Sequence, residues 1–295
     1  MEYCDYPVHA WSRSRHQMRR ICPRKAALCY REARLGADKE SDKMHRLIHD
    51  LRRRIPLEQY LNRIFDETIR RMFYRQELPF TAPEQLVAIL TCRFDRDLEQ
   101  MLCGSAAADH KKLFIRELEN SHCHLSNLVA LAQKTIRIRC EAVKKELWQL
   151  LNSTPVLQHR EIATPLQVQI NDLCCYCAPL AALENNGILW MIECNCDNFI
   201  ALLHKFYAVN TLGREPHLVR SFGYRRETGE FYEAGIELKV TETLRQISED
   251  GALWQELIAQ PLESVPVNPE HCPFCEYNFF CNKYLQNKSI QEVLP

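Results

Sequence analysis

Three cysteines near the C-terminus constrain this chain more than any other feature of its sequence. Cys272, Cys275 and Cys281 form a C-x2-C-x5-C array, and Pro273 favours a turn between the first two. Spacing this tight brings three thiolates around one soft metal centre, either zinc or an iron–sulfur cluster. Three buried cysteines without a metal are the alternative. We favour the metal because such spacing is typical of ligands.

A soft metal centre of this kind needs a fourth thiolate. No cysteine follows Cys281, so the fourth ligand must come from far upstream, and Cys22 in the sequence ICPRK is the best candidate. The centre would then join segments about 250 residues apart. Closing so long a loop restricts the unfolded chain strongly, so we expect the metal to stabilise the whole fold.

Composition narrows the class of protein. Lys+Arg and Asp+Glu each number 38, so the chain has no overall basic charge that would favour nucleic acid. The 15 cysteines come without a secretory leader, which predicts thiols in a reducing compartment. No apolar run approaches the roughly 20 residues needed to span a bilayer. We therefore expect an intracellular, cytoplasmic protein that does not enter a membrane.

The N-terminal half has helical periodicity. One helix is expected to reach Cys22 and to continue past Pro23, and another begins at Pro56. Apolar residues keep helical spacing over 82–151, where a long arm or subdomain is expected. This half therefore predicts long helices with apolar faces.

The period changes to two after Pro155. Strands are predicted at 165–171, 173–178, 188–192, 217–224 and 230–236. The sequence Glu184-Asn-Asn-Gly187 favours a hairpin turn, because Asn and Gly tolerate positive φ. Helices are predicted after the third strand and over 241–258. This order predicts an α/β fold around a mixed sheet flanked by long helices. Glycine numbers only 8, with no phosphate-binding glycine loop.

The plan resembles the PD-(D/E)xK nuclease superfamily, in the RecB-like branch that includes the CRISPR-associated exonuclease and the AddB helicase–nuclease subunit. The resemblance rests on four features spread over nearly the whole chain. They are Ser12 to Lys25, the hairpin segments Cys177-Ala-Pro-Leu180 and Ile192-Glu-Cys-Asn195, the helix with Tyr207 before Gly213-Arg-Glu-Pro216, and the closing cysteine array.

The resemblance implies a restriction-endonuclease-like core in a single domain over 1–295, with a mixed sheet, a long helical insertion and an iron–sulfur centre joining the two ends. Its expected parts are an N-terminal helical segment (1–80), a helical insertion (81–155), the core sheet (156–260) and a C-terminal iron–sulfur segment (261–295). In that family the first cysteine and the closing three hold a [4Fe–4S] cluster, which would place it on Cys22, Cys272, Cys275 and Cys281. Zinc is the alternative at the same four residues.

The chain departs from the family at the catalytic positions. Cleavage of DNA by Mg²⁺ or Mn²⁺ needs two carboxylates and a lysine. Pro179-Leu180 stands where the family has Pro-Asp, and Glu193-Cys194-Asn195 stands where it has Asp/Glu-x-Lys. Glu193, Asn195 and Asp66 are the degenerate site, with Asp66 in place of a helical His. We expect an inactive pseudonuclease.

A divergent nuclease is the alternative, and it would need substitute carboxylates around Glu193. Asp66, Glu161 and Asp172 are the candidates. Bound Mg²⁺ or Mn²⁺ is expected only if this site is retained. A zinc or redox-sensing protein that does not bind DNA is the third hypothesis.

Two further groups of residues carry open interpretations. Basic side chains could contact a phosphate backbone or form ordinary helix surface, and they are Arg24, Lys25, Arg52, Arg53 and Arg54. A second group of thiols could bind another metal or pack as small apolar residues, and it comprises Cys174, Cys175, Cys177, Cys194 and Cys196. The expected partners are DNA and the other proteins of a DNA-processing, CRISPR or phage-defence complex.

Overall fold

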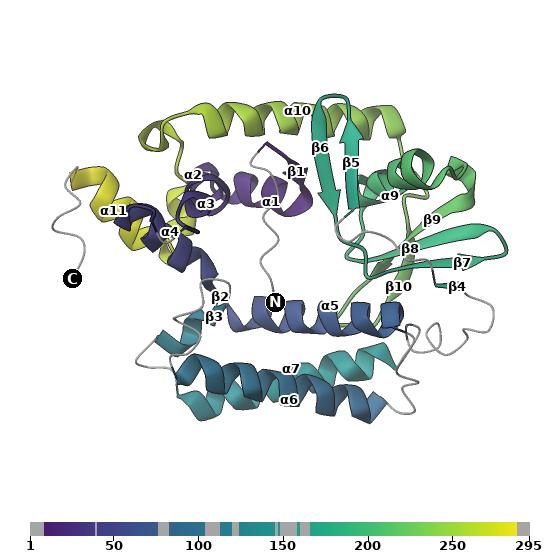
Figure 1. The fold of residues 1–295 in the computed structure, drawn as a ribbon, viewed down its shortest axis with the longest axis horizontal. Coiled ribbons are helices and arrows are strands. Elements are labelled where there is room, and N and C mark those ends of the chain that lie inside the picture. Colours follow the sequence, from purple (N-terminus) through teal and green to yellow (C-terminus); the bar gives the residue numbers. More distant parts are fainter. Residues whose placement is uncertain are drawn as a thin grey trace.

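The computed structural model describes residues 9–38, 40–75, 83–103, 113–119, 124–144, 147, 158–159 and 166–287. It is mixed α/β, with most strands at one end and a group of short helices at the other (Figure 1). The helices are α1 (Arg13–Ile21), α2 (Pro23–Ala27), α3 (Ala33–Leu35), α4 (Lys43–Arg53), α5 (Leu57–Arg75), α6 (Pro83–Leu102), α7 (Leu125–Val143), α9 (Asn198–Leu212), α10 (Val240–Ala259) and α11 (Asn278–Asn287). Across the described ranges, none of them has the apolar length to cross a bilayer.

The larger sheet has five strands in the order β10-β9-β8-β7-β4. Its strands are β4 (Gln158–His159), β7 (Ala181–Asn185), β8 (Ile188–Cys194), β9 (Val219–Tyr224) and β10 (Phe231–Ala234). Only β8 and β9 pair in parallel, and the other described pairs in this sheet are antiparallel. A parallel pair needs a crossover connection, which α9 supplies. The mixed sheet with a crossover helix is therefore confirmed.

The hairpin turn predicted at 184–187 is present and leads into the predicted strand at 188–192, but the strand before it is one that the sequence did not predict. Asn186 and Gly187 have φ values of 49° and 78°, and they connect β7 to β8. The strand pattern missed β7, because Pro179 interrupts the ladder after β6 and the chain resumes only at Ala181.

The predicted single sheet is wrong in one respect, since three strands form a separate sheet in the order β1-β6-β5. They are β1 (Trp11–Ser12), β5 (Leu166–Ile170) and β6 (Leu173–Cys177). The N-terminal β1 pairs in parallel with β6. It therefore occupies the edge of β6 at which a strand of the larger sheet would have to pair. A third, two-stranded sheet pairs β2 (Arg54–Ile55) with β3 (Phe114–Ile115).

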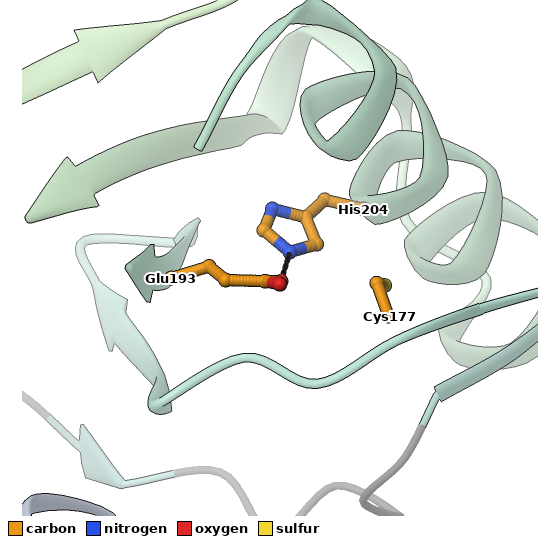
Figure 2. Close-up of side chains that lie close together, drawn as sticks. All are labelled: Cys177, Glu193 and His204. Atoms are coloured by element: carbon orange, nitrogen blue, oxygen red, sulfur yellow. Dashed lines mark hydrogen bonds and ion pairs between the residues drawn. The ribbon is translucent and has the colours of Figure 1, made fainter. Parts of the chain in front are cut away.

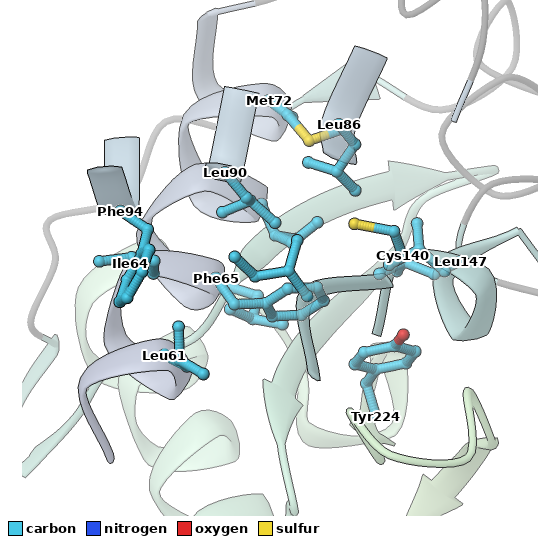
Figure 3. Packing of buried hydrophobic residues seen from close by; sticks show 14 of the residues in the cluster. Leu61, Ile64, Phe65, Met72, Leu86, Leu90, Phe94, Cys140, Leu147 and Tyr224 are labelled. Atoms are coloured by element: carbon cyan, nitrogen blue, oxygen red, sulfur yellow. The ribbon is translucent and has the colours of Figure 1, made fainter. Parts of the chain in front are cut away.

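Helices cover both faces of the five-stranded sheet. On one face α5, α6 and α7 pack against β7, β8 and β9, and Figure 3 shows this core around Phe65 and Tyr224. These two rings stack with centroids 6.5 Å apart. Fully burying a side chain such as Phe65 contributes about 2 kcal/mol. The described helices of the expected insertion are thus a layer of the main core, and α9 lies on the opposite face.

Side chains along β8 alternate between these two layers, as strand geometry requires. Leu189 and Met191 pack toward α9, whereas Trp190 and Ile192 pack toward α5 to α7. The alternation continues to the end of the strand, so Glu193 lies on the α9 side and Cys194 on the α5 side.

A third core joins the N-terminal helices to the C-terminal segment at the other end of the molecule (Figure 1). Leu28 and Ile48 from the N-terminal helices pack with Trp254 of α10 and with Tyr277 and Phe280 near α11. Segments more than 200 residues apart in sequence therefore share one apolar cluster.

The predicted continuous helix through Pro23 is wrong, because the chain breaks at Cys22. Cys22 has an extended backbone with φ of −157°, and α2 begins at Pro23. The ring of a proline disfavours the helical conformation of the preceding residue. Pro23 therefore ends α1 and sets the direction of the Cys22 side chain.

Candidate metal centres

The first candidate centre consists of Cys22, Cys272, Cys275 and Cys281, which we call the cysteine quartet. Its N-terminal member is fixed by hydrogen bonds to the C-terminal segment. Arg24 donates from its backbone to Pro266 O at 3.0 Å and from its side chain to Val265 O at 2.9 Å. Asn268 donates in return to Ile21 O at 2.9 Å. These bonds bring the start of α2 beside the closing array.

The closing cysteines are arranged by tight turns. A 3₁₀ turn (Pro269–Phe274) carries Cys272, and Cys275 N donates to Cys272 O at 3.1 Å. Cys281 lies one turn into α11, and its N–H donates to Tyr277 O at 2.8 Å. The three residues thus share a compact backbone that faces Cys22.

The thiols of the quartet are close enough together to shift the pKa values of two of its members. Burial raises the pKa of Cys275 to about 11, and the neighbouring Cys22 adds to the rise. Burial raises the pKa of Cys281 to about 12, and Cys275, Cys22 and Cys272 all contribute. Four thiols in one partly buried space form an all-sulfur donor set. This set fits a soft metal ion or cluster and does not suit Mg²⁺.

The second candidate centre brings together three residues that we call the Cys/Glu/His trio. Cys177, Glu193 and His204 each place a ligand atom within 4.8 Å of the other two. Figure 2 shows them projecting toward one space from the end of β6, the end of β8 and the middle of α9. Glu193 keeps 16% of its side chain exposed, and His204 is fully buried.

Hydrogen bonds fix the His204 ring at both nitrogens. His204 Nε2 lies 3.2 Å from Glu193 Oε2, and Nδ1 lies 3.1 Å from Ser221 Oγ. A carboxylate accepts only, so Nε2–H donates to Glu193 and Nδ1 accepts from the Ser221 hydroxyl. Ser221 is on β9, so the β8–α9–β9 crossover supplies three members of this arrangement.

The helix that carries His204 starts at a fixed place. Asp197 caps α9 by accepting a hydrogen bond from Ile200 N at 3.1 Å, a typical N-cap interaction. Two turns later His204 reaches the end of β8. Burial raises the pKa of the Cys177 thiol, and the nearby Glu193 carboxylate raises it further. Cys177 therefore stays protonated unless a cation is present.

The degenerate catalytic set of the sequence analysis is not assembled in one place. Asp66 on α5 pairs with Arg226, whose Nε donates to Asp66 Oδ1 at 2.6 Å, and it accepts from Cys194 Sγ at 3.4 Å. Because Cys194 and Glu193 point to opposite faces of β8, Asp66 is separated from Glu193 by the sheet. The structure does not bring these two carboxylates together.

Asn195 also turns away from Glu193. It is exposed, and its φ of 53° places it in the left-handed region. Left-handed backbone breaks the alternation of the strand, so Asn195 does not continue the Glu193 face. The same break returns Cys196 to the α9 side, where it packs in the core with Cys177.

Asp172, the other substitute carboxylate within the described ranges, does not complete a nuclease site. Asp172 is exposed in the turn between β5 and β6. At about 3.3 Å per residue, it lies roughly 16 Å along the strand from Cys177. Leu180, at the position of the family's aspartate, is fully buried. Glu161 lies outside the described residues.

Arg24 and Lys25 contact other residues of the protein. Besides its bonds to Val265 and Pro266, the Arg24 guanidinium donates to Glu263 O at 2.9 Å. Lys25 Nζ lies 2.8 Å from a Glu276 carboxylate oxygen, next to the quartet. These two cations connect the N- and C-terminal segments.

The arginine triplet is likewise engaged within the fold. Arg52 lies over the ring of Tyr30 at 5.3 Å, and burial lowers its pKa to about 10. Arg53 is buried, with 4% of its surface exposed. Arg54 lies 2.9 Å from Glu119 with about a third of its side chain exposed. The structure thus gives all five predicted phosphate-contacting residues interactions within the protein.

The second group of thiols divides between the layers instead of forming one cluster. Cys194 faces Asp66, whereas Cys175, Cys177 and Cys196 lie in the core on the α9 side. Cys174 is half-buried on β6. Only Cys177 joins a candidate metal site in the described residues.

The sequence analysis missed His204. Its signal was a single histidine in a mostly apolar helical run, three residues before Tyr207. A lone histidine in such a run is weak evidence by itself, and only the packing of α9 on β8 and β9 brings it to Glu193.

No protein-family model, curated protein or solved structure matches this chain. The two centres and the α/β fold are therefore the observations on which a functional proposal depends.

Proposed function

We propose that this chain is a nuclease-like iron–sulfur protein that does not cleave DNA and serves as a binding or structural subunit of a DNA-processing or defence complex. The observation that carries the proposal is the set of residues around Glu193. One carboxylate there is accompanied by an imidazole and a thiol, where metal-dependent hydrolysis would need two carboxylates and a lysine.

A [4Fe–4S] cluster is the proposed occupant of the cysteine quartet, with zinc as the alternative. Tetrahedral zinc–thiolate sites have Zn–S bonds of about 2.3 Å, so their sulfurs lie roughly 3.8 Å apart. Within the described ranges, no three quartet sulfurs lie within 4.8 Å of one another. The all-sulfur donor set fits either occupant.

A structural role is supported by the use of the basic residues. Arg24 and Lys25 connect the ends of the chain at the quartet, and Arg52, Arg53 and Arg54 have interactions within the fold. Arg24 and Lys25 hold the quartet region together, and the contact with DNA is expected to come mainly from the partner proteins.

The test is a cleavage assay of anaerobically purified protein on single- and double-stranded DNA with Mg²⁺ or Mn²⁺, with the visible spectrum and iron content measured on the same sample. Glu193→Ala and Asp66→Asn are assayed in parallel. We expect a brown protein with about four irons per chain and no cleavage. Cleavage that disappears in Glu193→Ala would contradict the proposal.

A binding titration then distinguishes the two roles of the proposed subunit. Labelled DNA is titrated at low and high salt, because neutralised phosphates release counterions and make affinity fall steeply with salt. Weak binding, similar in the parent and in Arg54→Gln, is expected for a structural subunit. Tight, salt-sensitive binding that Arg54→Gln weakens would assign direct DNA contact.

A further inference from the structure

We propose that Cys177, Glu193 and His204 form a second metal site, separate from the cysteine quartet, which binds one divalent transition-metal ion of the zinc class. The three side chains come from β6, β8 and α9, so the site exists only in the folded protein (Figure 2). This inference does not depend on whether the protein cleaves DNA, because its readout is metal content; its experiment rests on the proposed function only in that the quartet is filled beforehand.

The distances fit one ion. Each ligand atom lies within 4.8 Å of the other two. Zinc binds thiolate sulfur at about 2.3 Å and imidazole nitrogen or carboxylate oxygen at about 2.0 Å, so an ion between the three side chains requires only small shifts. Three protein ligands leave a fourth position for water, as in open zinc sites.

The charge also balances. A Cys177 thiolate and a Glu193 carboxylate carry two negative charges, and neutral His204 carries none. A divalent ion makes the buried site neutral, which avoids the free-energy cost of an unpaired buried charge. The Cys177 proton leaves to solvent when the ion binds, and Glu193 is partly exposed, which gives the ion a route from solvent.

The donor types select the metal. Mg²⁺ prefers six oxygen ligands in octahedral geometry, and a thiol and an imidazole are poor substitutes. Sulfur, nitrogen and oxygen donors together suit zinc and its neighbours among the transition metals. The donor set therefore favours a metal ion softer than Mg²⁺.

Ser221 is a positioning residue for this site. Before metal binds, His204 donates from Nε2 to Glu193 and accepts at Nδ1 from Ser221. Metal ligation at Nε2 requires the proton to be on Nδ1, and the Ser221 hydroxyl can then accept it as a hydrogen bond. A partner of this kind fixes the tautomer and the orientation of a ligating histidine.

The experiment uses anaerobic protein with its cluster intact, so that the quartet is filled. Zinc is added, excess is removed by gel filtration, and zinc and iron are counted by mass spectrometry. We expect one zinc per chain besides the iron, and X-ray absorption at the zinc edge should show one sulfur among lighter ligands. A thousandfold excess of Mg²⁺ should not displace the zinc.

Matched variants locate the ion. Cys177→Ser and His204→Gln should lower zinc affinity at least tenfold, with iron unchanged, and Ser221→Ala should lower it about 10- to 100-fold. Cys174→Ser, on the same strand but outside the trio, is the control and should bind like the parent. Glu193→Gln keeps the shape of the side chain and its hydrogen-bond acceptor, so it tests the charge even if the buried variants fail to fold.

Three results would overturn the proposal. They are cluster-loaded protein that takes up no zinc, an all-sulfur zinc environment, and Glu193→Gln protein that binds zinc with the parent's affinity.

Discussion

The cysteine quartet and the Cys/Glu/His trio are two centres built in opposite ways. The quartet takes three of its ligands from one short array and joins it to Cys22 at the other end of the sequence. The trio takes one ligand from each of three elements within the sheet region. The quartet thus links segments far apart in the sequence, which also share the third core, whereas the trio lies among neighbouring elements of the sheet region.

Because of this difference, we expect metal binding to affect the stability of the fold differently in the two centres. A metal that joins distant segments contributes its binding free energy to the stability of the whole chain. A metal placed between packed elements adds to a structure that forms without it. We therefore expect loss of the quartet to unfold the N- and C-terminal segments, and loss of the trio metal to leave the fold intact.

The largest expected effect comes from Cys275→Ser, which removes one quartet ligand. A thousandfold loss of metal affinity corresponds to about 4 kcal/mol of stability, and we expect at least this loss. The measurement is denaturant unfolding of anaerobic protein with its iron content. Cys92→Ser, at an exposed cysteine of α6, is the control and should unfold like the parent. A Cys275→Ser protein as stable as the parent would contradict the expectation that the quartet stabilises the whole chain.

The next effect tests how firmly protein contacts alone hold the N-terminal helix. Asp250 of α10 accepts hydrogen bonds from Trp11 Nε1 at 2.7 Å and from Arg19, and it lies 2.8 Å from His16 Nδ1. Asp250→Asn leaves the partly buried Arg19 cation without its charged partner, so we expect a loss of about 3 kcal/mol in unfolding experiments. Glu249→Gln, in an exposed ion pair, should cost no more than about 1 kcal/mol.

The Asp250 carboxylate also makes the stability of the fold depend on pH. Burial raises the pKa of Asp250, but hydrogen bonds from His16, Arg19 and Trp11 outweigh it and lower the pKa below the ordinary value of 3.8. The charged form therefore stabilises the fold above that value, and this contribution is lost as the pH falls through the lowered pKa. Asp250→Asn should flatten the stability curve below pH 3.8. An unchanged slope there would contradict this account.

The smallest expected effect concerns the end of α9, the helix that carries His204 of the trio. Gly213 ends α9 with φ of 64°, in the left-handed region that favours glycine. Gly213→Ala should cost about 1 kcal/mol in thermal unfolding, and Gly213→Asn should cost less. Neither should change the metal content, since the turn at Gly213 comes more than two helical turns after His204. Metal loss in Gly213→Ala would mean that the trio depends on the whole of α9.

Much of the fold could be predicted because periodicity is local. The start of α5 after Pro56, the helix α10 and the turn at Asn186-Gly187 all follow from residues a few positions apart. The strand β7 and the separate sheet of β1, β5 and β6 could not be predicted in the same way. Which strands pair depends on contacts between distant segments, such as Trp11 beside Cys175.

The two candidate sites also differ in whether the sequence could predict them. The closing array and its partner Cys22 were found from spacing and from the need for a fourth ligand, and the structure brings Cys22 to the array through Arg24 and Asn268. The trio was not found. Asp66 was predicted beside Glu193 because it stands where the resemblance places a helical histidine, but strand alternation puts the two carboxylates on opposite sides of the sheet.

The sequence alone therefore determined the local features of this protein: an array of cysteines with metal-ligand spacing, a helix that starts after Pro56, and a turn at Asn186-Gly187. The tertiary structure decided which side chains share a space. It buried Arg53, gave Arg52 and Arg54 contacts within the fold, paired Asp66 with Arg226, and brought His204 and Cys177 to Glu193. The physical reason is that spacing fixes neighbours only within a turn or a strand, whereas a site between β6, β8 and α9 exists only once apolar burial has packed these elements together.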